Sequence, residues 1–315
     1  MVIEDMNGTF ITEVVVLGFS GLPDFQNTLF AIFLTFYVLD LLGNLLIIGI
    51  ILVEPQLHTP MYFFLTNLSV LDIFCSSTAI PKMLHNILTK KNTISFSGCM
   101  VQMYLFTSFL GTELSLLAIM SYDRFVAICL PMHYPTIMSR RMCVNLAAVV
   151  WSIGTFNSVV HTALVLRLSF CGPNVINHFF CEIPPVLKLS CSDTTLNDYA
   201  TLVSDLILGL TCFLLTLISY ICIIFSIVRI RSNDKKRKAF STCAAHLNVV
   251  AMLYCTVIYT YVRPILPYSL NDDKIVSLMY TIVSPLLNPV IYSLRNKEVI
   301  QAFTKIWKKM FPSKI

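Results

Sequence analysis

Long apolar runs dominate the chain, and short polar segments separate them. Four runs contain no Asp, Glu, Lys or Arg, and they cover residues 142–166, 206–228, 239–262 and 275–294. Three more contain a single acid each, namely Asp40 in 25–53, Asp72 in 55–81 and Glu113 in 92–122. A helix needs about 20 apolar residues to cross a bilayer. The pattern therefore predicts seven transmembrane helices, because the runs are too long and too uniformly apolar for barrel strands.

The composition supports a membrane protein. Hydrophobic residues make up 56% of the 315 residues and charged residues only 12%, whereas soluble domains carry about 45–50% and about 25%. Half the usual charge cannot coat a water-exposed surface of this size. The same figures exclude disordered, collagen-like and small disulfide-rich proteins. The expected fold class is an all-α membrane protein, a seven-transmembrane helix bundle.

The basic residues predict which way the bundle faces, because Lys and Arg favour the cytoplasmic side. With the N-terminus outside, the inner face receives 15 of the 22: Arg124, Arg140, Arg141, Arg229, Arg231, Lys235, Lys236, Arg237, Lys238, Arg295, Lys297, Lys305, Lys308, Lys309 and Lys314. The outer face receives the other 7: Lys82, Lys90, Lys91, Arg167, Lys188, Arg263 and Lys274. We therefore expect an extracellular N-terminus. The net charge of +5 then indicates contact with anionic lipid, not nucleic acid.

The chain is expected to divide into an extracellular segment (1–24), a seven-transmembrane domain (25–295) and a cytoplasmic tail (296–315). Glu4 and Asp5 stand where a cleavable signal peptide has basic residues, so the first span is expected to act as an uncleaved anchor. Asn7 begins an N-glycosylation motif. Helical spacing in the tail predicts an amphipathic helix on the inner leaflet, with Val299, Ile300, Phe303, Ile306 and Trp307 on its apolar face.

Four of the 11 cysteines fall on the outer, oxidising side: Cys99, Cys171, Cys181 and Cys191. An even set on that side predicts two disulfides, with three possible pairings. A zinc site that uses His178 with these cysteines is the alternative, but the spacing matches no common zinc pattern.

Two acids stand out inside the membrane, Asp72 in the second span and Glu113 in the third. A charge at mid-membrane costs about 2.5–3.5 kcal/mol, so such acids are functional candidates. Without a buried base to pair with, two carboxylates either hold a cation or keep a proton. We favour a bound sodium ion; the alternative is a pair of hydrogen-bonded, partly protonated structural acids. Asp40 has no evident partner and is expected to face a polar gap between helices.

The inner ends of the third and seventh spans carry further candidates. Arg124 either pairs with Asp123 and is released when helices move, or extends to the headgroups. Pro289 removes a helix hydrogen bond and permits a kink, and Asn288 beside it can satisfy the freed backbone groups.

A set of motifs runs in order from about residue 20 to 300. The motifs are Gly43-Asn44, 57–65 (LHTPMYFFL) leading to Asn67-Leu68-Ser69 and Asp72, 120–129 (MSYDRFVAIC), Trp151, Ser219-Tyr220, 238–243 (KAFSTC) leading to His246-Leu247, and 285–292 (PLLNPVIY). Taken together, these motifs resemble the rhodopsin-like G-protein-coupled receptors and, within them, closely the olfactory receptors. Some positions depart from the family pattern: Ser121 replaces Ala, Phe125 replaces Tyr and Ala245 replaces Ser, and Asp40 is also unusual for the family.

The resemblance implies a plasma-membrane receptor that binds small, volatile odorants within the helix bundle. Its implied partner is a stimulatory, olfactory-type G protein, whose activation raises cyclic AMP; no enzyme activity and no cofactor are expected beyond the sodium ion. The implied disulfides are Cys99–Cys181 and Cys171–Cys191, and the implied sodium ligands are Asp72 and Glu113. The residues implied in activation and coupling are Asp123, Arg124, Tyr220, Lys238, His246, Asn288, Pro289 and Tyr292.

The ligand pocket follows from counting helical turns outward from these motifs. The expected lining is Phe106, Thr107, Leu110 and Gly111 on the third span, Ser204 and Asp205 on the fifth, Tyr254, Ile258 and Tyr261 on the sixth, and Thr281 on the seventh. Such a mostly apolar set with a few hydroxyls is typical of a small-molecule site. Simple helix packing is the alternative for each residue. Asp205 favours a hydrogen-bonding or amine ligand.

Other functions fit less well. The same receptor could serve a metabolite outside the nose, and the sequence does not separate these uses. A transporter or channel would use the buried acids as ion relays, but the second half of the chain does not echo the first. A membrane enzyme is disfavoured because the sequence contains no His-Glu-x-x-His motif, nucleophile elbow or Gly-rich phosphate loop.

Overall fold

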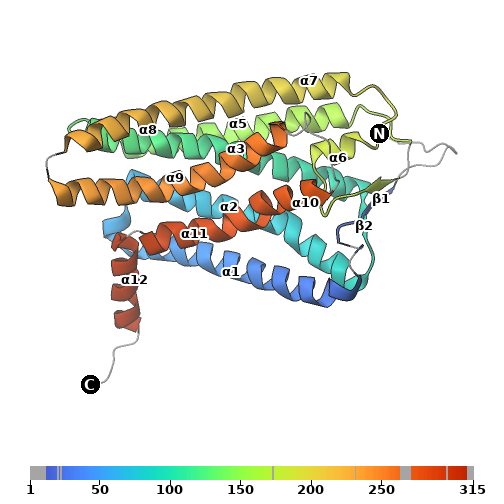
Figure 1. Ribbon diagram of the computed structural model, residues 1–315, viewed down its shortest axis with the longest axis horizontal. Helices are drawn as coiled ribbons and strands as arrows, with labels where there is room; N and C mark the ends of the chain where they lie inside the picture. Colours follow the sequence, from blue (N-terminus) through green and yellow to red (C-terminus); the bar gives the residue numbers. More distant parts are fainter. Residues whose placement is uncertain are drawn as a thin grey trace.

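The computed structural model describes residues 12–310, apart from 20, 22, 172–173, 231, 263–270 and 296. Long helices lie side by side along one axis (Figure 1). In chain order they are α1 (Gln26–Val53), α2 (Pro60–Thr89), α3 (Phe96–Cys129), α5 (Arg140–Val165), α7 (Thr195–Ser204), α8 (Thr211–Arg229), α9 (Asn233–Val262), α10 (Asn271–Leu278) and α11 (Ser284–Arg295). The π-helical turn η3 (Asp205–Leu210) joins α7 to α8, and η5 (Met279–Val283) joins α10 to α11.

Shorter elements close the two ends of the bundle. The strands β1 (Glu13–Val16), β2 (Thr93–Ser95) and β3 (Val175–Ile176) lie at one end with α6 (Ile183–Leu187). Helix α12 (Lys297–Met310) lies across the opposite end (Figure 1). The remaining short helices are η1 (Pro23–Phe25), η2 (Pro55–Leu57) and α4 (Tyr134–Ile137).

The outward surface of the bundle is apolar, as a bilayer requires. Helices α1, α2, α3 and α5 and the continuous segment Thr195–Arg229 are each long and apolar enough to cross a membrane. Their outward side chains include Leu52 and Phe156, which are 67% and 72% exposed. Backbone polar groups have no water to bond within lipid, so helices that satisfy them internally are the expected solution. The chain is therefore a helical membrane protein. Shorter apolar stretches, 246–256 and 276–292, lie in α9 and across α10, η5 and α11.

Several helices extend beyond the apolar runs that predicted them. Helix α2 continues to Thr89, so Lys82 lies inside it although the apolar run stops at residue 81. Helix α9 begins at Asn233, six residues before its run. A long basic side chain can keep its stem against apolar neighbours while its charge reaches the interface, so hydropathy alone underestimates helix length.

Helix α3 forms the centre of the bundle. It packs against α2, α5 and α8, and its Leu116, Leu117 and Val126 are fully buried. Helix α5 approaches α3 most closely at Gly154. A β-carbon there would lie 2.5 Å from the carbonyl oxygen of Ser108 and 2.9 Å from the backbone nitrogen of Thr112. Glycine at this position therefore permits the close crossing of α3 and α5.

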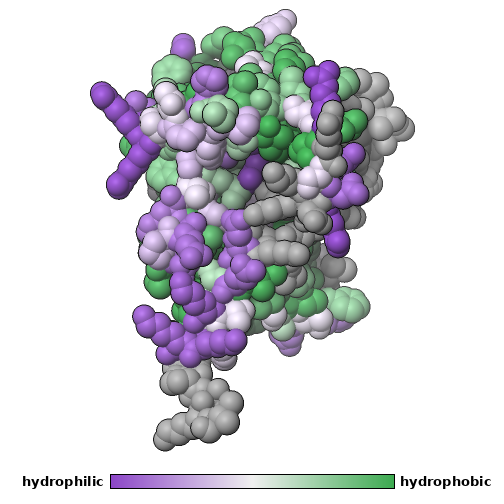
Figure 2. Space-filling view, turned by 90° about the vertical axis from the view of Figure 1, so that its left-hand side faces the viewer, coloured by the Kyte–Doolittle hydropathy of each residue, from purple (hydrophilic) through white to green (hydrophobic). Residues whose placement is uncertain are grey.

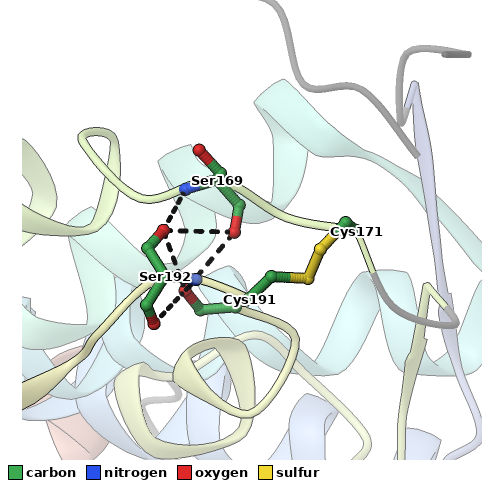
Figure 3. The surroundings of a disulfide bond; sticks show 5 residues. Ser169, Cys171, Cys191 and Ser192 are labelled. Carbon is green, nitrogen blue, oxygen red and sulfur yellow. Dashed lines mark hydrogen bonds between the residues drawn. A yellow bond between two sulfur atoms is a disulfide. The ribbon is translucent and has the colours of Figure 1, made fainter. Parts of the chain in front are cut away.

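A small sheet and two disulfides organise the end of the bundle opposite α12. The strand order is β2-β1-β3, with β1 antiparallel to β2 and parallel to β3. Cys171 is bonded to Cys191, and beside this bond the backbone nitrogen of Cys191 donates to the carbonyl oxygen of Ser169 at 2.9 Å (Figure 3). The hydroxyl of Ser192 accepts from the backbone nitrogen of Ser169 at 2.7 Å. These bonds hold the two ends of the loop between α5 and α7 together.

Replacing Gly154 by alanine should destabilise the bundle, because the added methyl would meet the backbone of α3, which cannot rotate away. Overpacking of this kind costs about 1–3 kcal/mol. The thermal unfolding midpoint of purified protein in detergent is the measurement, and Gly154→Ala should lower it. Gly49→Ala in α1 is the matched control, because nothing lies within 4 Å of a β-carbon there. Equal midpoints for both variants would contradict a glycine-dependent crossing.

Candidate functional site

The expected ligand-lining residues of α3 are buried or half-buried. Phe106 is only 3% exposed, and its ring lies 4.8 Å from that of Phe180 in the loop and 5.5 Å from that of Tyr280 in η5. Gly111 is buried against Gly154 of α5. Thr107 and Leu110 are half-buried on the same helix. Phe106 thus joins α3, the loop and η5 in one aromatic cluster.

The other expected lining residues lie in the continuous segment Thr195–Arg229, in α9 and in η5. Ser204 ends α7, and its hydroxyl lies 3.0 Å from Nε2 of His161 on α5, so it also ties two helices together. Asp205 begins the π-helical turn η3. Tyr254 is buried in α9 with its ring 5.2 Å from that of Phe213, and the fully buried Thr281 donates to the carbonyl oxygen of Ser277. The side chains of Ile258 and Tyr261 lie outside the described residues.

A polar cluster that the sequence did not reveal connects the loop between α5 and α7 to α10 and η5. Nε2 of His178 lies 3.0 Å from the hydroxyl of Ser277 and 3.3 Å from Oε1 of Glu182. The Tyr280 hydroxyl donates to Oε2 of Glu182 at 2.6 Å. Burial lowers the pKa of His178 below its ordinary 6.5, although the Glu182 carboxylate opposes the shift. The imidazole is therefore neutral at physiological pH. In the sequence, this cluster is indicated only weakly, by two polar residues, His178 and Glu182, that lie four positions apart on either side of Cys181.

This cluster has the residue types of a hydrolytic triad but not its geometry. In such a triad the serine and the carboxylate bond to different nitrogens of the imidazole. Here Ser277 and Glu182 both face Nε2 of His178, while Nδ1 faces the backbone nitrogen of Phe180 at 3.5 Å. The arrangement holds the loop in place and does not activate the serine.

The loop is also fixed to α3. Cys181 is bonded to Cys99, with their Cα atoms 5.4 Å apart. Oε1 of Gln102 accepts from the backbone nitrogen of Cys181 at 2.9 Å, and its Nε2 donates to the carbonyl oxygen of Thr78 at 2.8 Å. Both expected disulfides are thus formed. The loop segment from His178 to Glu182 covers the aromatic cluster around Phe106 and is anchored on two sides.

The buried acids lie near the middle of the bundle. Both carboxylate oxygens of Asp72 accept from Nδ2 of Asn288 at 3.1 Å, so Asn288 binds this acid and not the backbone groups freed by Pro289. Glu113 and Asp40 are electrostatic neighbours of Asp72. Asp40 has two partners that the sequence did not identify, Nδ2 of Asn44 at 2.7 Å and the hydroxyl of Ser76 at 2.5 Å.

Several oxygens around these acids have no hydrogen-bond partner within the described part of the chain: Oε1 of Glu113, Oδ1 of Asn288, Oδ1 of Asn44 and Oγ of Ser284. Carboxylate, amide and hydroxyl oxygens are the donors that hard cations prefer. The residues present therefore fit a sodium ion beside Asp72 and Glu113. Among the described residues, three or more His, Cys, Asp or Glu side chains are nowhere grouped as a metal site.

At the end that carries α12, the Tyr220 hydroxyl joins α8 to α9 and donates to the carbonyl oxygen of Cys243 at 3.5 Å. The Tyr220 hydroxyl lies 2.7 Å from Nδ1 of the buried His246. The Tyr134 hydroxyl donates to Oδ1 of Asp123 at 2.9 Å. The half-buried Arg124 forms no ion pair with Asp123 in the described part of the chain. Tyr292 is buried in α11. The side chain of Lys238 lies outside the described residues.

Helix α12 is attached to α1 and α2 at the end of the bundle opposite the sheet. Nζ of Lys305 lies 2.8 Å from Oε2 of the buried Glu54, which follows α1, and the Tyr62 hydroxyl donates to Oε2 of Glu298 at 2.9 Å. Hydrophilic side chains gather towards α12 at this end of the molecule (Figure 2). Phe303 and Trp307 of α12 remain 37% and 51% exposed. The helix therefore presents apolar side chains beside basic ones.

Comparison with known proteins agrees with this arrangement. The family model described as olfactory receptor matches residues 33–310. Olfactory receptor 13G1 of Homo sapiens is 51% identical over 302 residues, which cover 96% of this chain and 98% of that protein. Olfactory receptor 5AP2 of Mus musculus is 48% identical over 304 residues, and olfactory receptor 5I1 of Homo sapiens is 46% identical over 309 residues. These alignments cover 96% and 98% of this chain and the same shares of those proteins. Because the family model and these relatives cover nearly the whole chain, it belongs to the olfactory receptor family of rhodopsin-like G-protein-coupled receptors, which are not enzymes.

Proposed function

We propose that the chain binds small, volatile odorants within its helix bundle and, when occupied, activates a stimulatory, olfactory-type G protein that raises cyclic AMP. The family match over residues 33–310 carries this proposal. Ligand and G protein then favour the same conformation, so each strengthens the binding of the other.

The proposed topology has seven spans with the N-terminus outside, in the plasma membrane. Within the described residues, α1, α2, α3, α5 and the continuous segment Thr195–Arg229 are long enough to cross, and the apolar stretches 246–256 and 276–292 would supply the other two spans. Two observations support the orientation. The disulfides lie at the end opposite α12 and require an oxidising compartment, and the 15-to-7 split of the 22 basic residues favours α12 inside. In this topology 25–295 form the receptor domain, 1–24 with its Asn7 glycosylation motif lie outside, and 296–315 lie on the inner leaflet.

The proposed ligand site lies beneath the loop segment from His178 to Glu182. Its support is the aromatic cluster in which Phe106 meets Phe180 and Tyr280, since apolar walls with a few polar groups suit small-molecule ligands. In this proposal Thr107, Leu110 and Gly111 continue the wall formed by α3. The other walls of the site would be formed by Ser204, Asp205, Tyr254, Ile258, Tyr261 and Thr281. Asp205 would bind an amine or hydrogen-bonding ligand.

The proposed output end is the inner end of α3, α8 and α9. The hydrogen bond between Tyr220 and His246 holds α8 against α9, and its loss on activation would free α9 to move. Arg124 of α3 is an electrostatic neighbour of both Tyr220 and His246. It would then contact the G protein, together with Lys238 and the neighbouring inner-end residues. Asn288, Pro289 and Tyr292 would carry the change from the buried acids to this end, because Asn288 binds Asp72 directly.

Receptor function can be tested by cyclic AMP in cells that express the chain with an olfactory-type stimulatory G protein, screened against a diverse odorant panel. Arg124→Ala should abolish the dose-dependent rise while surface display is unchanged. Arg141→Ala is the matched control, because Arg141 is an exposed arginine at the same end and should keep the response. A response that survives Arg124→Ala would contradict the proposed coupling role.

A sodium ion at Asp72 and Glu113 should stabilise the purified receptor. A ligand present at tenfold its dissociation constant stabilises the folded state by about 1.4 kcal/mol. Replacing N-methylglucamine chloride by sodium chloride at constant ionic strength should therefore raise the thermal unfolding midpoint. Asp72→Asn and Glu113→Gln should lose this rise, while Asp198→Asn, which changes an exposed acid, should keep it. A sodium-dependent rise that is equal in all four proteins would exclude the buried acids as ligands.

A further inference from the structure

Lys82 is a basic residue inside a membrane-crossing helix. It lies seven residues before the end of α2 at Thr89, or about 10 Å at the rise of an α-helix. Its side chain is half-buried, and within the described part of the chain it forms no hydrogen bond or ion pair. Ionisable groups at this depth are costly unless they meet a counter-charge or reach the headgroups. The ammonium of Lys82 therefore needs an anionic partner from outside these residues.

Lys82 lies on the rim of a groove between α2 and α3 with a volume of about 610 Å³. The walls are mostly apolar and include Phe74 of α2 with Val101 and Leu105 of α3. The rings of Phe74 and Phe109 stack 5.8 Å apart, and both line the groove. Phe74 and Val101 are 48% and 57% exposed, so the groove opens outward towards lipid.

The uncharged polar residues that line the groove already have partners. The Ser77 hydroxyl lies 3.0 Å from that of Tyr37, and the Thr78 hydroxyl donates to the carbonyl oxygen of Phe74 at 2.7 Å. Both polar atoms of Gln102 are hydrogen-bonded, to Thr78 and to Cys181. Lys82 is the one charged residue among the described residues of the lining. The groove thus combines an apolar trough with a single positive charge at its rim.

We infer that this groove binds a phospholipid of the adjacent leaflet. The ammonium of Lys82 donates to the phosphodiester, and one acyl chain lies in the trough between α2 and α3. From Lys82 to Phe74 is eight residues, or about 12 Å along α2, which accommodates the upper part of an acyl chain. In the proposed topology this is the outer leaflet, but the inference rests only on the membrane-spanning helices and not on the signalling function.

The occupied groove would also support the ligand end of the molecule. It lies beside Gln102, whose side chain holds Cys181 of the loop. A lipid that packs against α2 and α3 at this level would hold the two helices in the spacing on which the Gln102 contacts depend.

Native mass spectrometry of the purified full-length chain can test the inference. Two probes with the same acyl chains are compared: dioleoylphosphatidylglycerol and dioleoylglycerol, which lacks the phosphate. The wild type should retain the phospholipid in preference to the diacylglycerol. Lys82→Gln should reduce phospholipid retention about fivefold, the equivalent of one lysine contact at a membrane surface. Val101→Trp should reduce retention of both probes because it fills the trough.

Two control variants separate charge from folding. Lys82→Arg should retain the phospholipid because it keeps the charge, and Lys91→Gln should retain it because Lys91 is exposed beyond the end of α2. Equal retention of the two probes by the wild type would overturn the inference, as would unchanged retention by both Lys82→Gln and Val101→Trp. Displacement of the lipid by inorganic phosphate alone would also overturn it, because the site would then bind a free anion.

Discussion

The lack of water in the bilayer core is the constraint on which the rest of this structure depends. A polar side chain inside the bundle is therefore stabilised by a partner within the protein. Asp72 meets Asn288, Asp40 meets Asn44 and Ser76, and Tyr220 meets His246. The contacts of Asp72 with Asn288, of Asp40 with Ser76 and of Tyr220 with His246 each join two helices, and Asp72 and Asn288 are 216 positions apart in the chain. A change in one contact can therefore alter the relative position of whole helices.

Much of the architecture could be predicted from the sequence because hydropathy acts over long, simple runs. The helical character, the candidate acids and the four cysteines that form disulfides all follow from residue type and position. The disulfide pairing required more, since residue counting left three alternatives and only the family resemblance favoured the observed one. The helix limits were less predictable. Lys82 lies within α2 because a lysine stem tolerates an apolar environment, and hydropathy counts only its charge.

The polar contacts between distant segments could not be predicted, because they depend on how helices rotate and how a loop folds. His178 and Glu182 bind Ser277 and Tyr280, nearly 100 positions away along the chain. Asn288 was expected to serve the backbone near Pro289, but rotation of α11 aims its amide at Asp72. Asp40 had no evident partner in sequence, and the packing of α1 on α2 gives it Ser76. Each partner depends on tertiary geometry that local patterns do not contain.

The proposed signalling depends on movement of α9 away from α3 and α8, against which it packs, at the end of the bundle that carries α12. The distance between spin labels at exposed positions 141 of α5 and 240 of α9 tests it, in protein whose exposed Cys255 is replaced by serine. Pulsed electron resonance should give a longer distance with agonist and nucleotide-free stimulatory G protein than with neither. An unchanged distance distribution in a complex that has demonstrably formed would contradict the account.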